Sequence, residues 1–210
     1  MPLVSNGPAG VRYPGDVPAY DVRTALIVVD VQNDFADAAG SLYVRGGEEI
    51  VPPVNAQIEE ALAAGALVAY TQDWHPPTTP HFQKDGGIWP VHCVAGTWGA
   101  ELHPDLLVDG PIVKKGVGGE DGYSAFSQRD TRSGEVDATQ LESLLRSAGA
   151  EQVVIAGLAT DYCVVETLLV AVRLGHRAAV LASMIRAVDR QPGDGDLAIE
   201  RMREAGAAIE

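Results

Sequence analysis

Short, uninterrupted apolar runs alternate along this chain with longer segments in which apolar residues recur at helical spacing. The runs are rich in β-branched residues and too short for buried helices, so they predict fully buried strands. These strands are expected at residues 24–30, 66–72, 111–115, 152–157, 177–182 and 207–210.

The segments between the runs predict helices, at residues 48–64, 137–149, 160–172 and 196–205. Pro52 and Pro53 fit only the first turn of the first helix, and Gly65 suits its end. Asp137 and Gln140 resemble a capping box at the start of the second. Because strands and helices alternate, the pattern predicts an α/β fold: three α/β/α layers around a mostly parallel, doubly wound sheet of about six strands.

The N-terminal stretch 1–20 breaks this pattern. It holds four prolines and three glycines but no apolar core of a signal peptide. We expect an extended arm over 1–20 and a single domain over 21–210.

Composition restricts the choice of partners. The net charge of the 210 residues is −14 and no basic cluster occurs, which argues against nucleic acid and anionic membranes as partners. No apolar run is long enough to span a membrane. Two cysteines, Cys93 and Cys163, do not form a disulfide scaffold and favour a reducing, cytoplasmic compartment.

Reactive side chains follow four of the predicted strands: Asp30, Asp73, Lys115 and, one turn later, Cys163. Each alone has an ordinary explanation, such as a helix cap, a turn or a solvated lysine. Parallel strands place their carboxyl ends on one sheet edge, where ligands bind in such folds. We therefore expect these four residues to meet there.

Cys163 lies where a helix is expected to begin, because Thr160 and Asp161 are typical helix-opening residues. A thiol in the first turn feels the positive end of the helix dipole, which favours the thiolate. Unpaired N–H groups of that turn could bind an oxyanion. The stretch suits a nucleophile, although an inert buried cysteine explains it equally well.

The long segment 73–110 gathers candidate metal ligands: Asp73, His75, His81 and His92. Mixed nitrogen and oxygen ligands suit Zn, Mn or Fe, if the prolines of the loop turn it back on itself. The alternative is a polar loop with hydrogen-bonded histidines, which is how we interpret His103 and His176. The aromatic residues Phe35, Trp74, Trp89 and Tyr123 could sandwich a flat ring beside this site, although core packing would explain any one of them.

Taken together, five motifs resemble those of the nicotinamidases, within the isochorismatase-like cysteine hydrolase family. They are Ile27–Phe35 (IVVDVQNDF), Asp73–His75 (DWH), Trp89–Cys93 (WPVHC) with Gly96 and Thr97, Lys115–Gly116, and Gly157–Cys163 (GLATDYC). The resemblance covers the chain from about residue 24 to its end.

The resemblance implies roles for these residues. Asp30, Lys115 and Cys163 would form a catalytic triad. Asp73, His75 and His92 would hold a divalent metal, zinc first and iron or manganese as alternatives, with His81 as a further ligand in some members. The metal would bind the pyridine nitrogen of the substrate.

It also implies a cis peptide bond between Leu158 and Ala159. The N–H groups of Ala159 and Cys163 would form the oxyanion hole, and Leu158 would belong to the substrate pocket.

The implied reaction is deamidation of nicotinamide to nicotinic acid and ammonia through a Cys163 thioester. A relative acting on another small amide, or a non-enzymatic metal- or ligand-binding protein, are the alternatives. The expected partner is a small aromatic amide, and the chain is compatible with a homo-oligomer.

Overall fold

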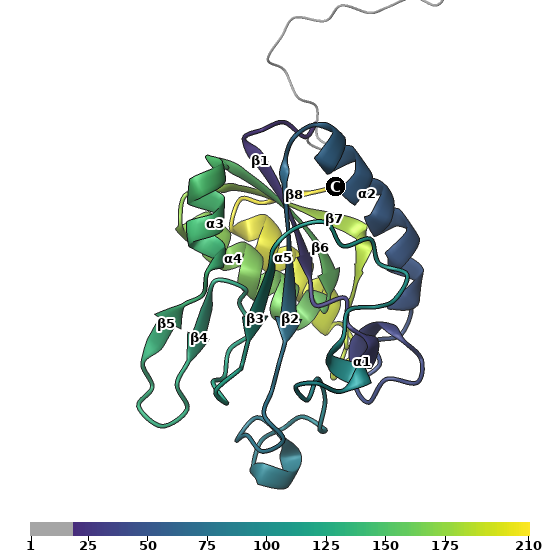
Figure 1. Cartoon of the computed structure of the whole chain (residues 1–210), viewed down its shortest axis with the longest axis vertical. Coiled ribbons are helices and arrows are strands. Elements are labelled where there is room, and N and C mark those ends of the chain that lie inside the picture. Colours follow the sequence, from purple (N-terminus) through teal and green to yellow (C-terminus); the bar gives the residue numbers. More distant parts are fainter. Residues whose placement is uncertain (1–18) are drawn as a thin grey trace, which may run out of the picture.

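The computed structural model describes residues 19–210, so the predicted arm lies outside the described residues apart from its last two. Six parallel strands form the central sheet (Figure 1). They are β1 Thr24–Val29, β2 Leu67–Asp73, β3 Ile112–Lys115, β6 Gln152–Leu158, β7 Arg177–Arg186 and β8 Ala208–Ile209. The predicted α/β class and sheet are thereby confirmed.

The strand order is β3-β2-β1-β6-β7-β8, so the direction of winding reverses between β1 and β6. Ile27 pairs with Ile155 across this junction. In doubly wound sheets the two chain segments that leave the sheet here diverge to opposite faces and open a crevice at the carboxyl edge. Asp30 and Cys163 follow the two strands that flank this junction.

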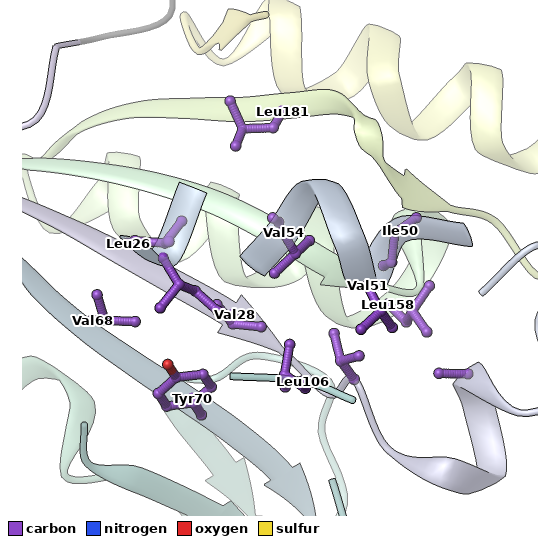
Figure 2. Packing of buried hydrophobic residues seen from close by; sticks show 14 of the residues in the cluster. Leu26, Val28, Ile50, Val51, Val54, Val68, Tyr70, Leu106, Leu158 and Leu181 are labelled. Atoms are coloured by element: carbon purple, nitrogen blue, oxygen red, sulfur yellow. The ribbon is translucent and has the colours of Figure 1, made fainter. Parts of the chain in front are cut away.

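One face of the sheet is covered by α2 Val51–Ala63, which follows a short 3₁₀ turn at Glu48–Ile50. Figure 2 shows Val51 and Val54 of this helix in one cluster with Leu26 and Val28 of β1. The short helix α1 Asn33–Ala36 also lies on this side. Tyr20, at the end of the predicted arm, is buried in the same cluster.

The opposite face is covered by α3 Leu141–Ala148, α4 Val165–Arg173 and α5 Asp194–Glu204. Their apolar side chains pack on the alternate residues of β1, Ala25, Ile27 and Val29. Both faces of β1 are therefore buried, which explains its uninterrupted apolar sequence. These layers match the predicted α/β/α sandwich.

One local prediction is wrong, and another, the helical start at Thr160, holds with a different geometry. Asp137 does not open a helix, because it lies in a strand hairpin formed by β4 Ser127–Arg129 and β5 Val136–Ala138. α3 begins at Leu141, whose N–H donates to the hydroxyl of Thr139 at 3.2 Å. Thr160–Val164 forms a π-helical turn before α4, without a side-chain cap.

Among residues 19–210, no helix has the length and apolar character needed to cross a membrane.

Candidate active site

The four reactive residues that follow the strands lie together, buried at the carboxyl edge of the sheet. Asp73 and Lys115 end β2 and β3 as register partners. Ligand atoms of Asp30, Asp73 and Cys163 all lie within 4.8 Å of one another. The sheet topology thus brings residues far apart in sequence into one polar cluster within an apolar interior.

Lys115 is the centre of this cluster. Its ammonium group lies 2.8 Å from Oδ2 of Asp30 and 3.5 Å from Sγ of Cys163, and it donates a short hydrogen bond to Oδ1 of Asp73. Burial alone would lower the pKa of Lys115, but the carboxylates of Asp30 and Asp73 hold it well above its ordinary value. Lys115 is therefore a permanent positive charge beside the thiol.

Asp30 follows β1 in a left-handed conformation, with φ of 48°. The Thr71 hydroxyl donates to its Oδ1 at 2.6 Å, which fixes the carboxylate. Its Oδ2 accepts no well-aligned hydrogen bond, despite the ammonium 2.8 Å away. Burial raises the pKa of Asp30, opposed by the charge of Lys115. Asp30 is thus a strengthened base with an oxygen able to accept a proton.

Cys163 differs from the expectation of a thiolate stabilised by a helix N-terminus. Burial raises the pKa of its thiol well above the ordinary value, and the charge of Lys115 offsets this only in part. The resting residue is therefore a neutral thiol. An adjacent base is needed to ionise it, and Asp30 lies within reach.

The peptide bond between Leu158 and Ala159 is cis, as the resemblance implied. Leu158, Ala159 and Cys163 all line one pocket. Ala159 thus contributes to the wall that carries the thiol.

Three histidines meet beside this cluster. Ligand nitrogens of His75, His81 and His92 lie within 4.8 Å of one another. Nε2 of His75 is 3.8 Å from Oδ2 of Asp73, the oxygen on the side away from Lys115. The loop therefore does turn back on itself.

The donor set fits a divalent metal ion. His75 is buried, yet neither of its ring nitrogens has a hydrogen-bond partner. An unpartnered buried imidazole costs stability unless something binds it. Gly116 leaves room for this ring, because a Cβ there would lie 2.5 Å from Nδ1 of His75. Three imidazoles and one carboxylate could supply tetrahedral nitrogen and oxygen ligation.

Two of the histidines have partners that direct their rings. Nδ1 of His92 donates to the Pro90 carbonyl at 2.7 Å. Nδ1 of His81 lies 3.1 Å from Oδ1 of Asp121. Burial lowers the pKa of His92 to about 4, so its ring is neutral at neutral pH and can act as a ligand. Asp121, which sequence reasoning missed, carried no periodic or motif signal.

Apolar and aromatic side chains enclose a pocket above Cys163 with about 360 Å³ of empty volume, part of it open to solvent. A mostly apolar and aromatic lining with a few polar groups on one side is typical of sites that bind a small ring. Its walls are Phe35, Leu42, Val44, Trp89, Tyr123, Leu158, Ala159, Tyr162 and Val188, with Asp73, His81, His92 and Cys163 at its polar side.

The structure brings Phe35, Trp89 and Tyr123 into this pocket but not Trp74. Side chains alternate along an extended chain, so Trp74 points away from the site that Asp73 and His75 share. Its ring instead lies 3.3 Å below the ammonium of Lys114.

Tyr162, and not the predicted Trp74, lines the pocket together with Phe35, Trp89 and Tyr123. Its ring meets the edge of Trp89, with centroids 4.8 Å apart. Its position directly before Cys163 was the available signal.

Known proteins resemble this chain in sequence and in fold. The isochorismatase domain family matches residues 24–210. A nicotinamidase of Escherichia coli K12 is 36% identical over 204 residues, 88% of this chain and 93% of its own.

Two solved structures superpose on almost the whole chain. A pyrazinamidase of Pyrococcus horikoshii in complex with zinc does so with a TM-score of 0.80 and 38% identity, over 90% of this chain and 98% of its own. PnC1 from L. infantum in complex with nicotinate has a TM-score of 0.81 and 33% identity, over 91% and 94%. The chain belongs to the isochorismatase family, as its motifs predict.

Proposed function

We propose that this protein is a nicotinamidase, which hydrolyses nicotinamide to nicotinic acid and ammonia through a thioester on Cys163. The observation that carries the proposal is the buried ammonium of Lys115, which lies between a strengthened base and the thiol of Cys163, and this thiol lines an aromatic pocket. The similarity to a nicotinamidase and to a nicotinate complex supports the substrate.

The first half of the reaction forms the thioester. Oδ2 of Asp30 takes the proton of Cys163, and Lys115 stabilises the resulting thiolate. The sulfur attacks the carboxamide carbon. The N–H groups of Ala159 and Cys163 hold the oxyanion, and one such donor contributes about 3–4 kcal/mol in other hydrolases that use an oxyanion hole. The proton then passes from Asp30 to the amide nitrogen, which leaves as ammonia.

The second half releases the acid. Asp30, again ionised, takes a proton from water as the water oxygen attacks the thioester carbon. The carbon–sulfur bond breaks, the sulfur regains the proton, and nicotinic acid leaves. Lys115 keeps its proton throughout and acts through its charge.

Asp73, His75, His81 and His92 would hold a divalent metal, and zinc is our proposal. When bound, it would supply a Lewis acid that anchors the nitrogen of the substrate ring. Asp73 serves two sites, since one oxygen faces Lys115 and the other faces His75. The pocket walls Trp89, Tyr123 and Phe35 orient the ring so that its carboxamide reaches Cys163.

The proposal is tested by ammonia release from purified protein with nicotinamide, pyrazinamide, benzamide and a ureido amide. Nicotinamide should be the best substrate, and benzamide, which lacks the ring nitrogen, should be poor. Chelation should reduce nicotinamide turnover, and zinc should restore it. Preferred turnover of the ureido amide would instead indicate a relative with another substrate, and no turnover of any amide would refute the proposal.

A further inference from the structure

The carboxylate of Asp121 links the side chains of two residues from different segments and also accepts a hydrogen bond from the backbone N–H of Gly122 at 2.9 Å. Its Oδ1 lies 3.1 Å from Nδ1 of His81, and its Oδ2 accepts a hydrogen bond from Arg129 at 2.9 Å. An ionised carboxylate can only accept hydrogen bonds, so Nδ1 of His81 must carry the proton. The lone pair of the neutral ring is then left on Nε2.

Asp121 is held by the β4–β5 hairpin and not by the histidine loop. The N–H of Asp121 donates to the carbonyl of Arg129 at 2.8 Å, and the N–H of Arg129 donates back at 2.6 Å. This antiparallel pair extends the ladder from β4 toward the site. The side-chain hydrogen bond of Arg129 adds a third link, so the carboxylate has a fixed position relative to the hairpin.

We propose that Asp121 is the positioning residue of the metal site, which holds His81 with Nε2 toward His75 and His92 and so makes the β4–β5 hairpin part of that site. The inference rests on the proposed metal-dependent function. Asp121 is not one of the candidate ligands and lies outside residues 73–92, so the inference adds a second segment to the metal site.

The three histidines differ in how they are held. His92 is directed by the carbonyl of Pro90 within its own loop, and neither ring nitrogen of His75 has a partner. His81 alone is directed by a charged side chain. Its ring also stacks on His75, with centroids 4.8 Å apart.

A carboxylate behind a metal-binding histidine orients the ring and increases its basicity, and loss of such a partner weakens metal binding about 10- to 100-fold. The competing explanation is a simple ion pair, in which His81 is doubly protonated. A doubly protonated ring has no lone pair and could not bind metal. The two explanations therefore differ in the protonation of Nε2.

The experiment compares zinc dissociation constants of the wild type, Asp121→Asn, Asp121→Ala and Arg129→Gln by competition with a chromophoric chelator. Glu120→Gln is the matched control, because it removes one negative charge from the same loop and its carboxylate bonds the backbone of Gly118. Nitrogen NMR of the metal-free proteins reports the tautomer of His81 at pH 7.5. Nicotinamide turnover is measured alongside.

We expect about 10- to 100-fold weaker zinc binding for Asp121→Ala. Asp121→Asn should lose less zinc affinity, because its amide oxygen still accepts a hydrogen bond from Nδ1 of His81. Arg129→Gln should also bind zinc more weakly than the wild type. Glu120→Gln should bind within twofold of the wild type. The wild-type spectrum should show the Nδ1–H tautomer, and Asp121→Ala should mix both tautomers.

Equal zinc affinity in the Asp121 variants and the wild type would overturn the inference while leaving the proposed function intact. A doubly protonated His81 in the wild type would also overturn it. A wild type that binds no zinc would refute the metal site itself and this inference with it. If Asp121→Ala does not fold, the inference is decided by the isosteric Asp121→Asn, through its zinc dissociation constant and the tautomer of its His81.

Discussion

The ammonium of Lys115 lies 3.5 Å from the sulfur of Cys163, and both groups are buried where β3 and β6 deliver them to one edge of the sheet. The same ammonium is the positive charge that offsets the carboxylates of Asp30 and Asp73. We therefore expect Lys115 to be needed for two separate reasons, the proposed chemistry of the thiol and the stability of the fold.

Lys115→Met should abolish nicotinamide turnover and lower the free energy of unfolding by about 3–5 kcal/mol, because two buried carboxylates lose their counter-charge. Denaturant unfolding at pH 7.5 measures the second effect. Lys114→Met is the matched control, since Lys114 lies on the Trp74 ring at the exposed side of β3 and should cost less than about 1 kcal/mol. Equal losses in the two variants would contradict this assignment.

Cys163→Ala should lower nicotinamide turnover by at least about a thousandfold, because the nucleophile is removed. Its zinc content should stay at the wild-type level, since Cys163 is outside the histidine cluster. Elemental analysis and ammonia release measure the two quantities. Cys93→Ala, which removes the other free thiol, should keep turnover. Activity of Cys163→Ala near that of the wild type would rule out the thioester mechanism.

Replacement of Trp89 and of Trp74 should have different effects on substrate binding. Trp89→Ala should raise KM for nicotinamide about tenfold, because loss of a stacking wall costs about 1.4 kcal/mol. Trp74→Ala should leave KM within about twofold, because its ring lies under Lys114 outside the pocket. Steady-state kinetics on both variants checks this. A larger KM effect at Trp74 would mean that its ring enters the site.

The metal-free protein should become less stable as the pH falls from 6.5 to 4. Burial lowers the pKa of His92 from 6.5 to about 4, so the unfolded chain binds a proton in this range that the folded chain does not. The contribution of neutral His92 to the free energy of unfolding is fully present above pH 6.5 and is lost as the pH falls to 4.

For His92 this loss amounts to about 3 kcal/mol at most. Unfolding free energies of the wild type and His92→Gln, both with chelator, should therefore converge as the pH falls. A constant difference across this range would show that His92 titrates normally.

The sheet could be predicted because its strands are buried on both faces. Residues of β1 and β6 are apolar without interruption, and parallel order follows from the intervening helices. Because the strands are parallel, the sequence also predicted that the reactive residues after them meet at one edge of the sheet. The hairpin could not be predicted, since β5 is exposed at all three positions and carries no apolar alternation.

Contacts between loops were also beyond sequence reasoning. Asp121 reaches His81 only through the backbone pairing with Arg129, which no periodicity encodes. The side to which Trp74 points depends on the extended path after β2. Burial of Cys163 in the finished core, rather than its place near a helix start, sets the direction of its pKa shift.

The candidate metal ligands all come from one continuous segment, residues 73–92, whereas Asp30, Lys115 and Cys163 lie at or after the ends of three separate strands. The candidate metal ligands are therefore encoded in a single short stretch of the gene, whereas the residues proposed for bond cleavage are distributed over most of it. Exchange of the part of that stretch beyond Asp73 would change the metal site and one wall of the pocket, while Asp30, Lys115 and Cys163 kept their places. The fold permits new specificities to evolve without rebuilding the chemistry.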